Sequence, residues 1–339
     1  MTAPLLELKH VTVMRGERAA LDDVSLTIGA GEHVCILGPN GCGKSTLIKT
    51  ITRECYPLAR EGSSIRILGR ELWNVFELRN LLGIVSPDLL AQCSTDATGR
   101  DVVLSGFFSS TRIFPHHQPE PEWLARAASA MERLGIAHLA GRAVARMSSG
   151  EAKRTLIARA LVHEPQALLF DEPSNALDLS AQFQLRDTMR ALARGTSAHS
   201  SVDLGALQET RECHSEAAFS PKNPLLPSAF IAETSPAESS AACHSEPAPF
   251  AGEESVSEAT SAQPSGVDAP GRPNRGLGIL LVTHHVSEII PEIERVVLLR
   301  AGRILADGPK DQILTAANLS NLFGVPVQLS RSDGYFQAW

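Results

Sequence analysis

The sequence contains no apolar run that approaches the roughly 18 residues needed to span a bilayer. Its first residues lack the basic start and the apolar core of a signal peptide. Its six cysteines form no C-x-x-C pair, so neither a zinc site nor a disulfide framework is indicated. These absences predict a soluble, cytoplasmic chain with reduced thiols.

The net charge of −7 is unevenly distributed over the 339 residues. Residues 194–276 contain eleven acidic and five basic residues, which leaves a net charge of −1 for the rest of the chain. A nearly neutral remainder argues against a nucleic-acid-binding face spread over the protein. We therefore expect no nucleic-acid partner.

The same stretch, 194–276, also differs in composition, because it holds nine of the 21 prolines and is crowded with Ser, Ala and Glu. Such a segment cannot bury enough apolar surface to offset its ordering entropy, so we predict a disordered, low-complexity insertion. Cys-His pairs recur within it at 213–214 and 243–244. They could in principle hold a metal ion, although a repeated insertion without a folded role is the favoured interpretation.

Residues 38–46 match the phosphate-binding pattern G-x-x-x-x-G-K-[ST]. An apolar run at 34–37 predicts a strand before this loop, and residues 44–51 predict a helix after it. Glycine lets backbone N–H groups approach phosphate oxygens where a Cβ would obstruct them. The predicted nucleotide-binding residues of the loop are Gly38, Pro39, Asn40, Gly41, Cys42, Gly43, Lys44, Ser45 and Thr46.

Within this loop, Lys44 is expected to reach the β- and γ-phosphates of ATP, and the Ser45 hydroxyl to ligate Mg²⁺. Cys42 lies near the predicted helix N-terminus, where a thiolate is favoured. We therefore expect alkylation of Cys42 to inactivate the protein and bound ATP to protect it.

Four motifs in the second half of the chain resemble those of ATP-binding-cassette (ABC) ATPases. Residues 147–151, Met-Ser-Ser-Gly-Glu, resemble the L-S-G-G-Q signature and precede a predicted helix. Residues 167–173 resemble the Walker B segment, 174–178 the D-loop and 281–284 the strand that ends in the switch histidine. Without the insertion, the spacing from the Walker B aspartate to that histidine is close to the usual one of the family.

The resemblance covers residues 5–328 apart from the insertion, and it implies an α/β fold. We expect a P-loop NTPase core with an antiparallel β subdomain and a helical signature subdomain. The expected first part of the nucleotide-binding domain is 5–193, with the helical subdomain at about 88–161. The second part is expected at 277–328, followed by a C-terminal tail at 329–339.

The resemblance also assigns roles to the residues of these motifs. Asp171 would hold Mg²⁺ with Ser45, and Glu172 would polarise the attacking water as general base. His284 would contact the γ-phosphate and stabilise charge in the transition state. Lys44 completes the predicted catalytic set.

A head-to-tail homodimer is implied as well. In it, the signature residues Ser148, Ser149 and Gly150 of one chain would cap the ATP held by the other chain, through backbone N–H groups at a helix start. Asp178 of the D-loop is placed among the nucleotide-binding residues on the same resemblance.

The chain departs from the family pattern at three places. Arg15 stands where an aromatic residue usually stacks on adenine, and a guanidinium can also stack on a base. Pro87 stands where a glutamine normally senses Mg²⁺ and couples to the membrane partner, with Gln92 as an offset substitute. Glu151 replaces the signature glutamine and would place a negative charge near the triphosphate, which predicts slower turnover.

The leading hypothesis is an ATP-binding and ATP-hydrolysing subunit of an ABC transporter. It would work with ATP and Mg²⁺ as a homodimer on the inner face of the cell membrane, beneath separate membrane-spanning permease subunits. Residues 318–327 resemble the ends of metal-chelate and molybdate-type importer ATPases. The alternative is a soluble ABC-family ATPase with a regulatory or remodelling role, which the missing glutamine favours.

Overall fold

The structure is a computed structural model that describes residues 3–93, 96–195 and 276–339. The predicted insertion at 194–276 lies outside the described residues except at its two ends. Its described neighbours are a helix that ends at Ala193 and a strand that begins at Gly278.

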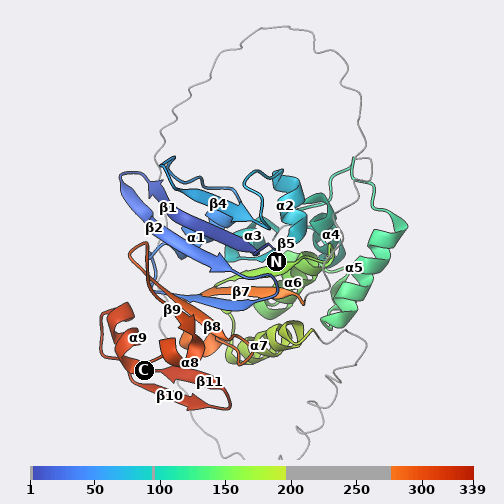
Figure 1. The fold of residues 1–339 in the computed structure, drawn as a ribbon. Coiled ribbons are helices and arrows are strands. Elements are labelled where there is room, and N and C mark those ends of the chain that lie inside the picture. Colours follow the sequence, from blue (N-terminus) through green and yellow to red (C-terminus); the bar gives the residue numbers. More distant parts are fainter. Residues whose placement is uncertain (1–2, 94–95, 196–275) are drawn as a thin grey trace, which may run out of the picture. The chain divides into compact units, whose positions relative to one another are not determined.

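A six-stranded sheet forms the centre of the described part (Figure 1). In spatial order its strands are β5 (Leu82–Val85), β6 (Ala167–Asp171), β7 (Gly278–Thr283), β3 (His33–Leu37), β8 (Arg295–Arg300) and β9 (Arg303–Pro309). The first five are parallel, and β9 pairs with β8 in the antiparallel sense. The carboxyl ends of β3, β6 and β7 therefore meet at one edge, where ligands of open α/β sheets bind.

Two smaller sheets complete the strands. The antiparallel three-stranded sheet has the order β2 (Arg18–Ile28), β1 (Leu6–Arg15), β4 (Ser64–Ile67). Near the C-terminus, β10 (Leu329–Ser332) and β11 (Tyr335–Ala338) form a hairpin.

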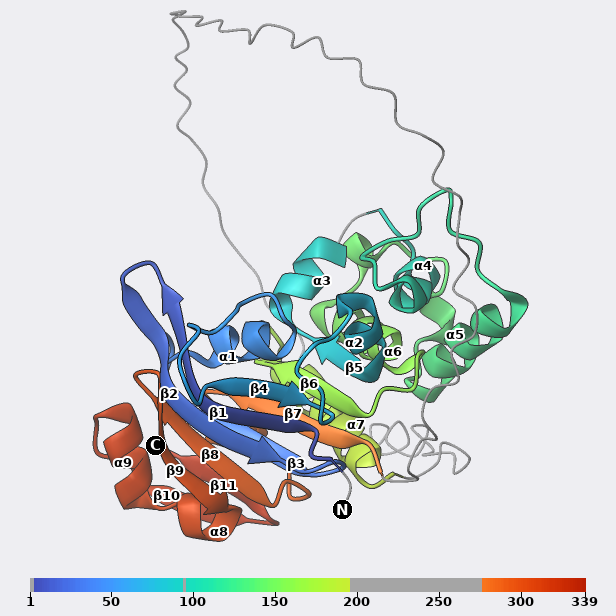
Figure 2. The ribbon, with the colours of Figure 1, turned by 45° about the horizontal axis from the view of Figure 1, so that its top comes forward.

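Nine α-helices belong to the described residues. They are α1 (Lys44–Ile51), α2 (Val75–Leu81), α3 (Pro87–Cys93), α4 (Gly99–Leu104), α5 (Pro121–Arg133), α6 (Ser149–Leu161), α7 (Leu179–Ala193), α8 (Lys310–Ile313) and α9 (Ala316–Phe323). Short 3₁₀ turns occur at Ser105–Phe108, Ala137–Leu139, Val144–Arg146 and Val286–Glu288. Figures 1 and 2 show α3, α4 and α5 gathered on the side away from α8 and α9.

Both faces of the parallel strands are buried, because successive side chains point to opposite faces of a sheet. In β3, Val34 and Ile36 belong to one apolar cluster, and Cys35 and Leu37 belong to the other. The first cluster contains side chains of α1 and of the three-stranded sheet; the second contains side chains of α4, α5, α6 and α7. Helix α1 is thus fixed between the two sheets at the end of β3.

The structure agrees with the predicted α/β fold and with its antiparallel β sheet. The predicted helix at 44–51 appears as α1, and the predicted strand before His284 appears as β7. The hairpin at Leu329–Ala338 was missed, because the sequence suggested only a tail there. Within the described residues, no helix is both long and apolar enough to cross a membrane.

Candidate functional site

The loop between β3 and α1 is shaped by two glycines that no other residue can replace. Gly43 precedes α1 with a φ of 111°, and a Cβ placed on it would lie 2.3 Å from the carbonyl oxygen of Ala20. A Cβ on Gly38 would lie equally close to the carbonyl oxygen of Leu299. The loop is therefore in close contact with the backbone of β2 at Ala20 and of β8 at Leu299.

Lys44 follows this loop as the first residue of α1, and its side chain is only 4% exposed. Its Nζ donates hydrogen bonds to the carbonyl oxygens of Gly38 (2.9 Å) and Pro39 (3.0 Å). The same amine lies 3.3 Å from Oε1 of Glu172. A buried cation thus sits under the loop, next to the carboxylate predicted to be the general base.

Glu172 is held in an unusual backbone conformation at the end of β6. Its φ is 44°, and its N–H donates to the carbonyl oxygen of Val282 at 2.8 Å. The side-chain amide of Asn175 donates to Oε2 at 2.6 Å, and Nδ1 of His284 lies 3.2 Å from Oε1. A left-handed conformation in a residue with a side chain costs about 1–3 kcal/mol and is typical of functional sites.

The adjacent carboxylates Asp171 and Glu172 are in opposite electrostatic environments. Burial, reinforced by the charge of Glu172, raises the pKa of Asp171 to about 6. Burial would also raise the pKa of Glu172, but the hydrogen bond from Asn175 and the charge of Lys44 outweigh it and lower that pKa. Glu172 is therefore ionised at neutral pH and ready to accept a proton or orient a water.

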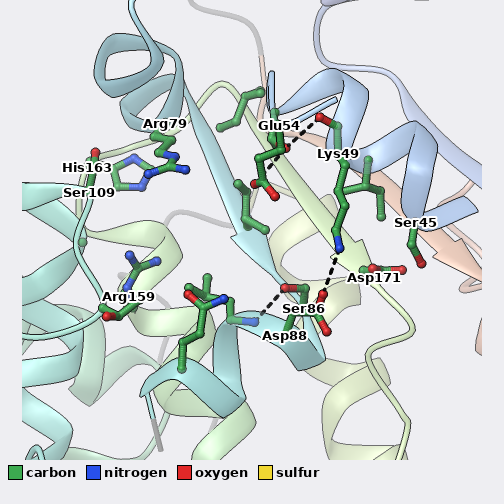
Figure 3. A pocket seen from close by; sticks show the side chains of 18 residues that line it. Ser45, Lys49, Glu54, Arg79, Ser86, Asp88, Ser109, Arg159, His163 and Asp171 are labelled. Carbon is green, nitrogen blue, oxygen red and sulfur yellow. Dashed lines mark hydrogen bonds and ion pairs between the residues drawn. The ribbon is translucent and has the colours of Figure 1, made fainter. Parts of the chain in front are cut away.

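The residues present fit a divalent cation. Oδ1 of Asp171 is a buried atom with no hydrogen-bond partner among the residues that the structure describes, and an anionic oxygen in that position is stabilised by a cation. Asp171 and the exposed Ser45 line the same cleft of about 200 Å³ (Figure 3). Carboxylate and hydroxyl oxygens are ligands that Mg²⁺ accepts.

The environment of Cys42 differs from the expectation that its thiolate is favoured. Its side chain is buried, and burial raises its pKa, which outweighs the opposite effect of Lys44. The sequence showed the helix N-terminus but not the tight packing of the sulfur against Gly38. The thiolate is therefore disfavoured at this position.

The signature and D-loop residues lie on exposed helix starts. The Ser148 hydroxyl accepts from the N–H of Glu151, whose carboxylate accepts from the N–H of Ser148 at 2.7 Å. Asp178 caps α7 by accepting from the N–H of Ala181. Ser149 is exposed, and a Cβ on Gly150 would lie 3.0 Å from the Cβ of Ala181. The starts of α6 and α7 therefore lie close together at Gly150 and Ala181, and Glu151 is a helix cap in this chain.

Three predicted positions remain: Arg15, Pro87 and Gln92. Arg15 is exposed and lies opposite Arg18 in the register of β1 and β2, at the end of their hairpin. Strand β2 of the same hairpin approaches Gly43 at Ala20. Pro87 is the first residue of α3, a position that suits proline because its missing N–H has no partner in a helix. Gln92 is exposed and lines the cleft together with Ser45 and Asp171.

Two buried charged residues, Lys153 and Glu288, were not anticipated from the sequence. Lys153 of α6 is 3% exposed, and its Nζ has no hydrogen-bond partner among the described residues. Burial lowers its pKa, while the charges of Glu288, Asp171 and Glu172 act in the opposite direction. The carboxylate of Glu288 accepts a hydrogen bond from Ser174. The burial of Lys153 follows from the face that α6 turns to the interior, which the sequence alone does not show.

Comparisons with known proteins agree with this geometry. The family model described as "ABC transporter" matches residues 21–175. An uncharacterised ABC transporter ATP-binding protein, YmeB of Lactococcus lactis, is 30% identical over 183 residues, which cover 53% of this chain and 69% of YmeB. The chain belongs to the ABC transporter ATP-binding proteins.

Other ABC proteins are similar over different shares of their length. The zinc import ATP-binding protein ZnuC of Marinobacter nauticus is 34% identical over 193 residues. That alignment covers 57% of this chain and 65% of ZnuC, just under two thirds. An inward-facing structure of an ABC transporter assigned to the metal-chelate type superposes with a TM-score of 0.60 at 19% identity, covering 100% of this chain and 96% of that one. At that identity the superposition shows the fold alone, and it confirms the predicted one.

Proposed function

We propose that this ABC protein is the ATP-hydrolysing subunit of a membrane transporter, working as a homodimer beneath separate membrane-spanning subunits at the inner face of the cell membrane. The observation that carries the proposal is the convergence of Lys44 and His284 on one oxygen of Glu172. A base, a phosphate-binding cation and a switch histidine at one strand edge suit phosphoryl transfer to water.

The roles follow from the environment of each side chain. Glu172 is ionised and would orient the attacking water and take its proton. Lys44 is held under the phosphate loop and would exchange its contacts with the loop carbonyls for phosphate oxygens. His284 would share the γ-phosphate with this pair.

Ser45 and Asp171 are proposed to hold Mg²⁺ in the cleft. When bound, the ion would supply positive charge that neutralises the phosphate oxygens. Burial raises the pKa of Asp171 to about 6, which still lies below 7. Its carboxylate is therefore largely ionised at pH 7 and available as a ligand.

The dimer is proposed from the signature segment. Ser148, Ser149 and Gly150 lie at the start of α6, where both serine side chains are exposed. A second copy facing them in head-to-tail orientation would place its phosphate loop at this helix N-terminus.

Pro87 favours a second candidate, a soluble ABC ATPase without a permease, because the coupling glutamine is missing there. Two measurements on the full-length protein separate the candidates. The purified protein should hydrolyse ATP in a Mg²⁺-dependent manner, and affinity capture from native membranes should co-purify an integral membrane protein. Hydrolysis without any membrane partner would favour the soluble alternative, and the absence of hydrolysis would contradict both.

A further inference from the structure

The cleft lined by Ser45 and Asp171 contains a second aspartate, Asp88, which the proposed mechanism does not use. Asp88 lies in the first turn of α3, and its Oδ2 is 3.3 Å from Nζ of Lys49 (Figure 3). Lys49 is four residues after Ser45 on α1, so both side chains lie on one face of that helix. One ion pair therefore joins the start of α3 to the face of α1 that carries the proposed metal ligand.

The negative charge of Asp88 acts on the carboxyl group of Asp171. It adds to burial and to the charge of Glu172 in raising the pKa of Asp171, although it is a smaller effect than those two. Two carboxylates that face one cleft and repel each other form a site that gains stability when a cation lies between them. Glu54, another carboxylate of the cleft, is engaged elsewhere, because it accepts a hydrogen bond from Thr52 at 3.1 Å.

The pairing of Asp88 with Lys49 is easily exchanged. The Asp88 side chain is 72% exposed and that of Lys49 is 32% exposed. Ion pairs in such positions contribute only about 0–1 kcal/mol, so a competing cation displaces the lysine at little cost. Asp88 is thus restrained near the cleft without being locked to its partner.

We propose that Asp88 is a positioning residue for the divalent cation of this site. Its carboxylate binds the water shell of a Mg²⁺ ion that Ser45 and Asp171 ligate, and Lys49 competes for the same carboxylate. Mg²⁺ keeps several of its waters when it binds proteins through one or two carboxylates, which leaves those waters for an outer acceptor. The inference rests on the proposed nucleotide- and Mg²⁺-binding function and adds a residue of this chain to it.

The test measures metal binding directly. Full-length protein is saturated with a non-hydrolysable ATP analogue, and Mn²⁺ is titrated while the free ion is followed by electron paramagnetic resonance. Loss of an outer-shell partner typically weakens metal affinity by about tenfold or more, so Asp88→Asn should weaken Mn²⁺ binding by about tenfold. Lys49→Gln should strengthen it, because the competitor is removed. Neither change should alter binding of the analogue in the absence of metal.

Two matched variants decide the interpretation. Glu54→Gln removes the same charge from the same cleft and should leave Mn²⁺ affinity within twofold of the wild type. Gln92→Ala removes the polar side chain that lies one turn after Asp88 on α3. If Asp88→Asn behaves like Glu54→Gln, or if Gln92→Ala alone weakens Mn²⁺ binding, the inference is wrong while the proposed function stands. A wild-type protein that binds no nucleotide would overturn both.

Discussion

Lys44 and Glu172 meet as a partly buried ion pair, with Nζ 3.3 Å from Oε1. The two residues come from different parts of the chain, one from the start of α1 and the other from the end of β6. Parallel pairing of β3, β7 and β6 brings these ends to one edge. The pair ties the phosphate loop to the proposed base, so each of the first two predictions concerns one partner.

Replacing Lys44 by Ala should abolish ATP binding, because the cation that the loop carbonyls of Gly38 and Pro39 hold is removed. Truncating one member of a buried charge pair costs about 2–5 kcal/mol, so the affinity should fall at least about thirtyfold. Titration with a fluorescent ATP analogue measures the change, with the exposed Lys9→Ala as control. Undiminished affinity in Lys44→Ala would contradict the assignment.

Glu172→Gln should bind ATP, fail to hydrolyse it and accumulate as an ATP-bound dimer. The amide keeps the shape of the carboxylate but cannot take a proton from water. Size-exclusion chromatography with ATP and Mg²⁺ should show the dimer, and a phosphate-release assay should show no turnover. A variant that stays monomeric while hydrolysing ATP at the wild-type rate would rule out the role of Glu172 as base.

Cys42 should resist alkylation in the folded protein. Its side chain is buried and its pKa is raised, whereas Cys55 is half-buried at the surface. Maleimide labelling followed by peptide mass spectrometry should modify Cys55 before Cys42, and Cys42 only after denaturation. Rapid labelling of Cys42 in the native protein, blocked by ATP, would restore the original expectation of a reactive thiol.

His163 should make the protein less stable as the pH falls from 6.5 to 4. Burial, together with the charge of Arg159, lowers its pKa from 6.5 to about 4. In this window the unfolded chain binds a proton that the folded protein does not, so the free energy of unfolding decreases as the pH is lowered. The loss amounts to at most about 1.4 kcal/mol per pH unit.

Chemical denaturation at several pH values measures this effect. His163→Gln cannot titrate and should show a shallower loss of stability between pH 6.5 and 4. The exposed His138→Gln is the matched control and should follow the wild type. Equal slopes for all three proteins would show that His163 is not the group responsible.

Deleting residues 196–274 should leave folding and ATP hydrolysis nearly unchanged. The segment connects the end of α7 to the start of β7, and both elements are anchored in the described part: His33 contacts the Ala193 carbonyl oxygen at 3.0 Å, and Gly278 pairs with Ala167. Loop-closure entropy grows logarithmically, so about 80 residues in place of about ten cost roughly 2 kcal/mol. Thermal unfolding and phosphate release compare the two proteins; a large loss of either would reveal a function in the segment.

Much of the fold was predictable because its signals are local. The run from Ala167 to Phe170 predicts a buried strand, and the pattern Gly-Lys-Ser at 43–45 predicts a loop followed by a helix. The hairpin at Leu329–Ala338 was not predictable from its own residues. Tyr335 lies against the guanidinium groups of Arg186 and Arg190 of α7, so tertiary contacts contribute to its order.

The candidate site was predictable as a set of residues but not as an environment. The sequence named Lys44, Asp171, Glu172 and His284 from their motifs. It could not show that the sulfur of Cys42 is buried, since that sulfur belongs to an apolar cluster with side chains of β2 and β8, which are distant in the sequence. The same limit hid Lys153, whose position in α6 faces the interior only because that helix packs against the sheet.

The capping box of α6 has a consequence for assembly. Ser148 and Glu151 occupy each other's backbone N–H groups, so an anionic side chain of the chain itself already neutralises this helix end. In the proposed dimer, a triphosphate from a second subunit would use those donors only after the cap has opened, which costs about 1 kcal/mol. Glu151 would then compete with the nucleotide for the helix N-terminus, and its removal should lower the ATP concentration at which two chains associate.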